Sequence, residues 1–506
     1  MSLHFEFPAN LSAEQFIAQL SDKADAQLVS RHYSIKTYYD SFDWRLYSNG
    51  VTCELDRSKS ASSLTLTNLK TGLVIAGAEF DDVPKFSNQF AGAVRSALEP
   101  ILEIRALSSV CTLNCESYHL NITNKDEKTV LRLLIEEHEL LNNRVSLQPV
   151  KGYDKTAKHI AEILTAKLGL MPADKPVLLA ALRLQGRRPN DYSSKLNINL
   201  DPAMRADIAS KYIYSHLLKA IKANEQGTIA DTDSEFLHDF RVAVRRTRSG
   251  LSQIKGVLPD NIVAHYAEFF SWLGQITGPT RDLDVYLLNF EHYKSSLPAS
   301  IREDLNPLHD FLVAKKQKAH KELATKLRSA RYKTTLSEWE QYLKKPSFKE
   351  PMEQNAHLTI KELADKRIWK VFNRALQEGD AINRESPAEA LHELRKTCKK
   401  LRYLMEFFQS LYPDHQIKHL IKTLKGFQEV LGDFQDYAVQ EQNLKLFSEE
   451  MMVLNTPSNT FLAMGVLIQD LDGRRCSARK DFASRFEDFK QEENRSAFKS
   501  LFDAKD

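Results

Sequence analysis

A histidine followed by four basic residues at fixed spacing opens one stretch of this sequence. The five are His238, Arg241, Arg245, Arg246 and Arg248, so the basic residues follow the histidine at +3, +7, +8 and +10. Arg suits phosphate because its planar guanidinium donates two parallel hydrogen bonds, and a histidine adds a donor that strengthens below a pH of about 6.5. The chemistry that this pattern favours is the binding of phosphate oxygens.

The same pattern returns 154 residues later. Its members are His392, Arg395, Lys399, Lys400 and Arg402. A second shared block begins 40 residues after each histidine, at Gly278 and at Gly432, and the same offset of 154 residues holds there. A third and weaker match pairs His320 and Lys321 with Arg479 and Lys480. Three blocks in the same order indicate an internal duplication.

Each histidine block predicts a helix. Gly and Pro are absent until several residues beyond +10, and the apolar residues recur with helical spacing. At about 100° per residue, the histidine and the residues at +3, +7 and +10 share a stripe roughly 80° wide. An apolar stripe lies directly beside it in both copies, made of Phe240, Val244 and Leu251 and of Leu394, Cys398 and Met405. Arg246 and Lys400 fall about 80° to the other side, so they belong to a rim or to plain surface.

Two interpretations of the basic stripe compete, a solvated charged face and a groove that lacks its counter-ion. A solvated face normally interleaves Glu and Lys at i, i+4, whereas this stripe is basic throughout. Like charges that line up beside apolar residues repel one another, which favours an absent polyanion as partner.

The second shared block adds one further candidate and an open alternative. Arg281 could bind phosphate, while Asp282 and its match Asp436 are expected to orient an arginine of the groove through an ion pair. A metal site at Asp282 and Asp284 is the sharper alternative, but Asp284 becomes Ala438 in the second copy.

Composition places the chain among ordinary globular proteins. Its 506 residues are too many for one core and predict two or three domains. A net charge of +3 means that the argument for a polyanion depends on local clustering. The start lacks the features of a signal peptide and no apolar run reaches about 18 residues, so we expect a soluble, cytoplasmic protein that does not enter membranes. The five scattered cysteines, with one C-x3-C spacing, are expected to be free thiols.

The chain predicts a multidomain α+β protein. Residues 1–170 hold short alternating or apolar stretches between turn residues, which indicates a mainly antiparallel β-barrel with helices over 13–21, 88–98 and 155–168. Residues 171–203 are rich in proline and are expected to form a linker. Residues 204–500 predict an all-α domain of two helical bundles, over about 204–345 and 360–500, related by a pseudo-two-fold axis.

These paired motifs resemble the CHAD domain, the conserved histidine α-helical domain, over roughly residues 204–500. The resemblance implies two pseudo-symmetric bundles, a basic central groove and binding of inorganic polyphosphate, in some members at polyphosphate granules. The residues expected to contact polyphosphate are His238, Arg241, Arg245, Arg246, Arg248, His392, Arg395, Lys399, Lys400, Arg402, His320, Lys321, Arg479, Lys480 and Arg281.

The first 170 residues resemble a CYTH triphosphatase-like barrel in layout. The similar segments are 38–40, 45–50, 64–66 and 151–153. CYTH enzymes open with an E-x-E-x-K strand that holds metal and phosphate, and only Glu6 of that strand remains here. Glu54 and Asp56 stand where the family places basic residues, and Thr67 replaces a lysine. We therefore expect a degenerate barrel without catalytic residues, metal or cofactor, in which Glu136 and Glu137 are surface acids.

Three functions follow for the whole chain. The first is non-enzymatic binding of inorganic polyphosphate. The second is a triphosphatase or polyphosphatase that acts through the CYTH-like barrel, which the broken E-x-E-x-K strand disfavours. The third is a general nucleic-acid or polyanion-binding module, which normally needs exposed aromatic residues for base stacking, and the basic stripes offer only Tyr403.

Overall fold

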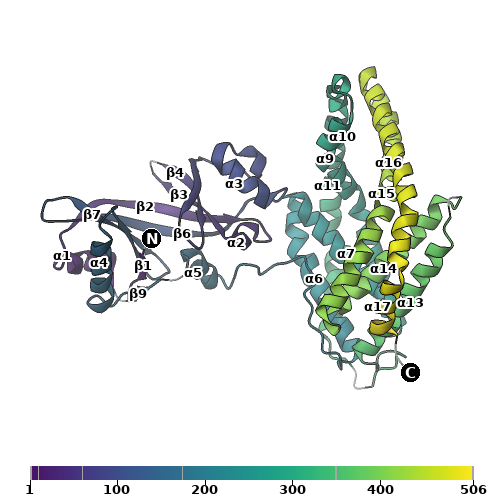
Figure 1. Ribbon diagram of the computed structural model, residues 1–506, viewed down its shortest axis with the longest axis horizontal. Helices are drawn as coiled ribbons and strands as arrows, with labels where there is room; N and C mark the ends of the chain where they lie inside the picture. The colour runs from purple at the N-terminus through teal and green to yellow at the C-terminus, as the bar shows by residue number, and fades with distance from the viewer. Residues whose placement is uncertain are drawn as a thin grey trace. The chain divides into compact units, whose positions relative to one another are not determined.

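Two compact units make up the chain. The computed structural model describes residues 3–9, 11–59, 61–173, 175–347, 350–383 and 385–503. Contacts within the chain separate residues 1–193, here called the sheet unit, from residues 194–506, here called the helical unit. Each unit is described by itself (Figure 1).

One antiparallel sheet organises the sheet unit. Its strands are β1 (Leu3–Glu6), β2 (Ala26–Asp40), β3 (Val51–Ser58), β4 (Ser62–Asn68), β5 (Val74–Glu79), β6 (Ser108–Thr123), β7 (Thr129–His138), β8 (Arg144–Pro149) and β9 (Met171–Pro172). They lie in the order β5-β4-β3-β2-β6-β7-β8-β1-β9, and β2 and β6 form the long central pair. The predicted antiparallel sheet is confirmed. It is open, however, because no pairing within the described residues joins its edge strands β5 and β9.

Helices cover this sheet where its side chains are apolar. They are α1 (Ala13–Ser21), α2 (Arg45–Ser48), α3 (Gly92–Leu102), α4 (Asp154–Ala166) and α5 (Val177–Leu184). α1 and α4 pack on β6, β7 and β8, while α3 packs on β3, β4 and β5. The predicted helix over 13–21 is confirmed, and α3 begins four residues later than predicted.

The expected linker contains regular structure. Within residues 171–203, β9 pairs with β1, and α5 buries Leu178 and Leu182 beside Trp44. The apolar run that begins at Val177 explains why this part packs onto the sheet unit despite the prolines around it.

The helical unit contains the remaining helices. They are α6 (Ala206–Ala230), α7 (Ser234–Gln253), α8 (Asp260–Ile276), α9 (Gly278–Leu288), α10 (Phe290–Ser296), α11 (Asn306–Arg328), α12 (Ala330–Lys344), α13 (Ile360–Asp380), α14 (Ala388–Phe408), α15 (Asp414–Met452), α16 (Ser458–Lys490) and α17 (Glu492–Phe502). The all-α prediction for this part of the chain is confirmed. No helix among the described residues combines the length and apolar character that crossing a bilayer requires.

The duplication extends to the first residues of the helices. α6 and α13 begin at 206 and 360, α7 and α14 at 234 and 388, and α8 and α15 at 260 and 414, so the offset is 154 residues each time. The copies differ at one point. α8 ends before Gly278 and Pro279, while α15 continues through Gly432, because proline cannot continue the hydrogen bonding of a helix interior.

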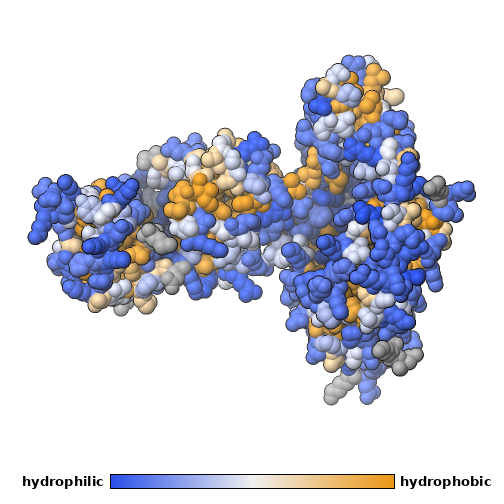
Figure 2. Space-filling view, viewed as in Figure 1, coloured by the Kyte–Doolittle hydropathy of each residue, from blue (hydrophilic) through white to orange (hydrophobic). Residues whose placement is uncertain are grey.

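Two arms extend from the helical unit in Figure 1, one formed by α9, α10 and α11 and the other by α15 and α16. A separate apolar core joins them, and in it the Tyr286 ring packs against Phe447 at 5.4 Å between ring centroids. The Tyr286 hydroxyl also donates to the carbonyl of Gln440, at 3.3 Å. Figure 2 shows apolar surface on the upper part of this unit, and the exposed apolar residues on the second arm include Met452, Val453 and Leu462.

Candidate functional site

α7 and α14 present the basic residues predicted from the sequence. α7 begins at the N-cap Asp233, whose carboxylate accepts hydrogen bonds from the backbone amides of Glu235 and Phe236. The apolar stripe expected beside the basic one is buried in both helices, which turns the basic stripes toward their partly exposed border. This burial fixes the rotation of each helix about its axis.

The two helices pack against each other and bring equivalent cations together. Lys399 lies 154 positions after Arg245, and each lies within electrostatic range of the other. Burial lowers the pKa of Lys399 to about 8, assisted by the positive charges of Arg395, Arg245 and Arg402. We call Arg241, Arg245, Arg248, Arg395, Lys399 and Arg402 the basic cluster.

Arg241 is the most constrained arginine in the cluster. Its Nη1 donates to the Thr277 hydroxyl at 2.7 Å and to the Gly274 carbonyl at 3.1 Å. Burial lowers its pKa to about 10, and the neighbouring charge of Arg245 adds to the shift. Arg241 therefore remains protonated at neutral pH although it is surrounded by like charge.

The shared glycines leave room for these arginines. A Cβ atom added at Gly278 would lie 3.8 Å from Nη1 of Arg241, and one added at Gly432 would lie 3.6 Å from Nη2 of Arg395. The two contacts are equivalent under the 154-residue offset. Gly274 is tighter still, since an added Cβ would approach Nη1 of Arg248 to 2.8 Å. Sequence reasoning missed Gly274, which has no glycine partner in the second copy.

Acidic and polar residues of the second shared block face the cluster. Asp436 accepts a hydrogen bond from Nη2 of Arg395 at 3.0 Å, as an orienting ion pair would. Asp282 lies near Arg241 and Arg281, and burial raises its pKa, to which the nearby Asp436 contributes. Asp282 and Asp436 are equivalent residues, so they meet across the same pseudo-two-fold axis as Arg245 and Lys399.

The two histidines have different surroundings. His392 Nδ1 lies 3.1 Å from Oε1 of Gln435, the residue equivalent to Arg281. Both His238 and His392 are partly exposed on their helices. Arg281 donates to the Ser234 carbonyl at 3.3 Å, so its guanidinium is turned toward the start of α7.

Asp284 belongs to another set of contacts. Lys316 bridges it, at 3.0 Å, to Asp231, at 3.2 Å. Asp282 and Asp284 thus contact different cations, and within the described ranges no three His, Cys, Asp or Glu side chains are grouped to hold a metal ion. Lys316 is a residue that the motif comparison did not single out.

Comparisons with known proteins agree with the duplicated motifs. The CHAD domain family model matches residues 213–445. Two curated proteins of Mycobacterium tuberculosis, from strains CDC 1551 and H37Rv, are each 25% identical over 324 residues, and both are named only as uncharacterized. The match covers 63% of this chain and 59% of each relative. Residues 213–445 form a CHAD domain.

Solved structures give weaker similarities. The CHAD domain of the plant Ricinus communis is 22% identical with a TM-score of 0.49, covering 58% of this chain and 96% of that one. PptA from Streptomyces chartreusis is 14% identical with a TM-score of 0.44, covering 56% and 99%. A Hippeastrum protein described as an adenylyl cyclase with dominant triphosphatase activity is 13% identical with a TM-score of 0.30, covering 38% and 99%.

Two of the expected contacts in the CHAD domain point away from the basic cluster. Arg246 forms an ion pair with Glu406 of α14 at 2.9 Å and donates to the Ser194 carbonyl at 3.2 Å. Glu406, which lies 3.5 Å from Arg402 as well, is an acid that the sequence comparison missed. Lys400 lines a separate pocket beside α13.

The third shared block contributes little to the cluster. His320 Nε2 lies 2.9 Å from the Thr228 carbonyl oxygen, and Arg479 donates to the Ser386 carbonyl and stacks near Phe434. Lys321 and Lys480 are exposed. The structure therefore gives these four residues contacts or exposure of their own and does not bring them to the pair of α7 and α14 by any contact shown.

The sheet unit holds a cavity of about 520 Å³ with the wrong charge for phosphate. Lys36 is its one buried amine among the described residues, and it lies 3.1 Å from Glu54 and 3.8 Å from Asp56. Lys36 also forms an ion pair with Glu136. Burial alone would lower the pKa of Lys36, but the carboxylates of Glu54 and Glu136 raise it well above its usual range. Thr67 lines the same cavity.

Two expectations about carboxylates in this unit need comment. Glu136 was predicted to be a surface acid, and this is wrong, because its side chain is only 13% exposed and engages Lys36. The prediction failed because β7 is longer than its apolar run and turns Glu136 into the cavity. Glu6, the remainder of the metal-binding strand motif, forms an ion pair with Arg144, which also donates to the Lys175 carbonyl.

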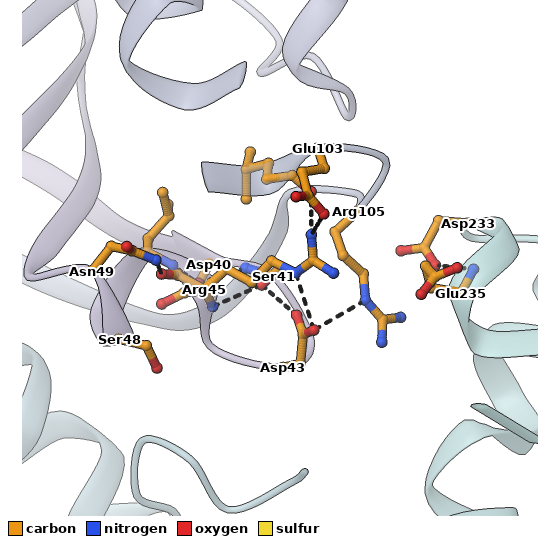
Figure 3. A network of polar contacts seen from close by, with 12 residues as sticks. Asp40, Ser41, Asp43, Arg45, Ser48, Asn49, Glu103, Arg105, Asp233 and Glu235 are labelled. Carbon is orange, nitrogen blue, oxygen red and sulfur yellow. Dashed lines mark hydrogen bonds and ion pairs between the residues drawn. The ribbon is translucent and has the colours of Figure 1, made fainter. Parts of the chain in front are cut away.

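Other residues of the CYTH-like motifs have structural roles (Figure 3). Asp40 accepts hydrogen bonds from the backbone amides of Ser41, Leu46 and Tyr47, and burial raises its pKa to about 6. Asp43 accepts from Arg45 at 3.1 Å and from Arg105 at 3.3 Å. These contacts hold the turn around α2 and leave Asp40 and Asp43 occupied.

Proposed function

We propose that this chain binds inorganic polyphosphate without cleaving it, on the basic cluster of its CHAD domain. The observation that carries the proposal is the meeting of equivalent cations, Arg245 and Lys399, at the contact between α7 and α14. A linear chain of phosphates offers regularly spaced negative charges along a two-fold related row of cations.

Like charge held at this density is costly without a counter-ion. The lowered pKa values of Arg241 and Lys399 express that cost in the free protein. A polyanion would remove it by pairing with both groups at once. This is the reason to prefer a bound polyanion to a merely solvated face.

The enzymatic alternative lacks support in the sheet unit. Its cavity contains the carboxylates of Glu54, Asp56 and Glu136 against the amine of Lys36, so a triphosphate would meet net negative charge. The acid that matches the metal-binding strand, Glu6, is paired with Arg144.

The nucleic-acid alternative also loses its one aromatic candidate. Tyr403 is only 6% exposed, so its ring has no face on which a base could stack. A location in the cytoplasm and assembly at polyphosphate granules remain predictions of the sequence and of the family resemblance.

The test is equilibrium binding of labelled long-chain polyphosphate across a salt series, with single-stranded DNA of matched charge as competitor. We expect the Arg245→Gln/Lys399→Gln variant to bind at least about tenfold more weakly and to show a shallower salt dependence, because two phosphate contacts are lost. The His238→Ala/His392→Ala variant should also bind more weakly, since each histidine is a donor on the same stripe.

A matched control removes two charges elsewhere. Lys344 and Lys418 are exposed and already paired with Glu340 and Asp414, so Lys344→Gln/Lys418→Gln should bind like the wild type. Equal loss in the control, or equal competition by DNA, would show a general polyanion surface and contradict the proposal.

A further inference from the structure

A second basic pocket lies in the helical unit, outside the basic cluster. Its volume is about 650 Å³, and it is formed by the end of α7, the start of α8, and the middle of α13 and α14. Its charged lining residues are Lys255, Arg367, Lys370, Arg374, Lys400 and the single acid Asp260. On α14, Lys400 points about 100° around the helix from Lys399 of the cluster.

The pseudo-two-fold relation shows what this pocket lacks. Arg246 and Lys400 are equivalent, as are Ser252 and Glu406, by the offset of 154 residues. On one side of the axis Arg246 forms its ion pair with Glu406. On the other side Lys400 lines the pocket together with Ser252, which carries no charge. The second copy therefore keeps the cation and has no carboxylate in the equivalent place.

Arg367 is the cation with the least compensation. Its Nε is buried and has no hydrogen-bond partner in the part of the chain that the structure describes. Burial alone lowers its pKa, with no carboxylate nearby to offset the shift. A guanidinium nitrogen that is buried and aimed into an open pocket is the arrangement that an incoming anion would complete.

The other cations are also available. Arg374 is paired with Glu378 at 2.6 Å. Lys255, Lys370 and Lys400 form no ion pair with any residue described in the structure. The pocket therefore holds an excess of positive charge that its own lining does not neutralise.

The walls of the pocket are fixed by hydrogen bonds. Asn355 donates from its backbone amide to the Gly256 carbonyl at 2.7 Å and from its side chain to the Lys255 carbonyl at 2.8 Å. Gly256 has a φ of +67°, so a side chain at this position would be strained. α8 begins at Asp260 without a side-chain cap, which leaves amides of its first turn for an anion.

We propose that this pocket binds a compact anion with two or more phosphate groups, at a site independent of the basic cluster. Planar and point cations on three sides match phosphate oxygens, and the volume admits a small molecule or the end of a phosphate chain. The shared chemistry is the phosphate group, and its source is either a free phosphorylated molecule or a chain terminus. This proposal stands whether or not the cluster binds polyphosphate.

The test is calorimetric titration of the full chain with inorganic tripolyphosphate. We expect Arg367→Gln/Lys370→Gln to lose at least about tenfold in affinity at one site, because charge-assisted hydrogen bonds are removed. Lys366→Gln, on the same helix but exposed and outside the pocket, is the matched control and should bind like the wild type. The Arg245→Gln/Lys399→Gln variant should retain the pocket site.

Repeating the titration with saturating long-chain polyphosphate separates the sources. Unchanged tripolyphosphate affinity at the pocket indicates a free small molecule, and competition indicates that chain ends occupy it. If Arg367→Gln fails to fold, Lys255→Gln/Lys370→Gln replaces it, since both lysines are exposed. Wild-type binding by the folded pocket variants, or loss of all tripolyphosphate binding in the cluster variant, would overturn the proposal.

Discussion

Single side chains in the basic cluster trade stability for charge. Lys399 is held close to Arg395, Arg245 and Arg402, and its pKa falls to about 8. The folded protein therefore releases this proton more readily than the unfolded chain, whose lysines titrate near ~10.4. Stability of the free protein should rise with pH between these two values, because the unfolded chain binds more protons there.

Lys399→Met tests this trade at one residue. We expect the variant to be more stable than the wild type at pH 7, by ~1 kcal/mol after allowance for solvent screening, because the unfavourable ammonium is gone. Its polyphosphate affinity should fall, and the loss of affinity that the wild type shows between pH 7 and 9 should disappear. Thermal unfolding and binding across this pH range measure both effects.

Lys396→Met provides the control on the same helix. Lys396 is 49% exposed and paired with Glu393, so neither stability nor the pH profile should change appreciably. A destabilised Lys399→Met would mean that the ammonium is compensated in the free protein and would contradict the explanation.

At the scale of elements, α7 and α14 form the unit on which the site depends. Their apolar stripes are buried on one side, their cations converge on another, and the Arg246–Glu406 ion pair joins them. The side chains of that pair are 14% and 12% exposed, so it lies in a poorly solvated place. Removing one partner leaves the other charge without compensation.

Glu406→Gln should therefore lower the free energy of unfolding of the helical unit by about 3 kcal/mol. The double variant Arg246→Met/Glu406→Met should be milder than the single one, because no charge is left unpaired. Denaturant unfolding of the four members of the cycle measures the coupling.

The exposed pair on α14 is the comparison for this cycle. Glu393→Gln breaks the Lys396–Glu393 contact, whose side chains are 49% and 59% exposed, and should leave the midpoint of unfolding unchanged. If Glu406→Gln behaves in the same way, the buried pair does not hold the two helices together.

On the scale of the whole molecule, the two units differ in the sign of their interior charge. The cavity of the sheet unit gathers carboxylates around Lys36, whereas the helical unit gathers cations at the cluster and in the second pocket. Phosphate chemistry is therefore expected only in the helical unit. The sheet unit uses its charges to stabilise its own fold.

Lys36→Met separates these roles. We expect a loss of about 3–5 kcal/mol in the stability of the sheet unit at pH 7, because Glu54 and Glu136 lose their ammonium. In the wild type, Lys36 holds the pKa of Glu136 low against burial, so its stabilisation is lost as pH falls through that pKa. In the variant the pKa of Glu136 rises, so stability should instead recover as pH falls below neutral.

Polyphosphate binding by this variant should match the wild type. Lys70→Met removes an exposed lysine from the same unit and should affect neither property. Loss of polyphosphate binding in Lys36→Met, with the helical unit still folded, would place part of the phosphate site in the sheet unit.

The sequence by itself determined the local and the repeated features of this protein. Helix α1, the first residues of α7 and α14, and the paired basic positions follow from short-range periodicity and from the 154-residue offset. These features are visible because helical faces and duplications are encoded by neighbouring residues. The polar composition of β6 hid a 16-residue strand from the same reasoning, since its stability comes from pairing with β2 and β7.

Only the tertiary structure decided which partner each charge meets. Arg246 turns to Glu406, Lys400 to the second pocket and Glu136 to Lys36, although their neighbours in the sequence do not distinguish these outcomes. Such partners lie on other helices and strands, so they depend on how whole elements pack. The packing of α7 on α14 thus turns two similar basic stripes into one cluster and one pocket, because the copies differ at Ser252 and Glu406.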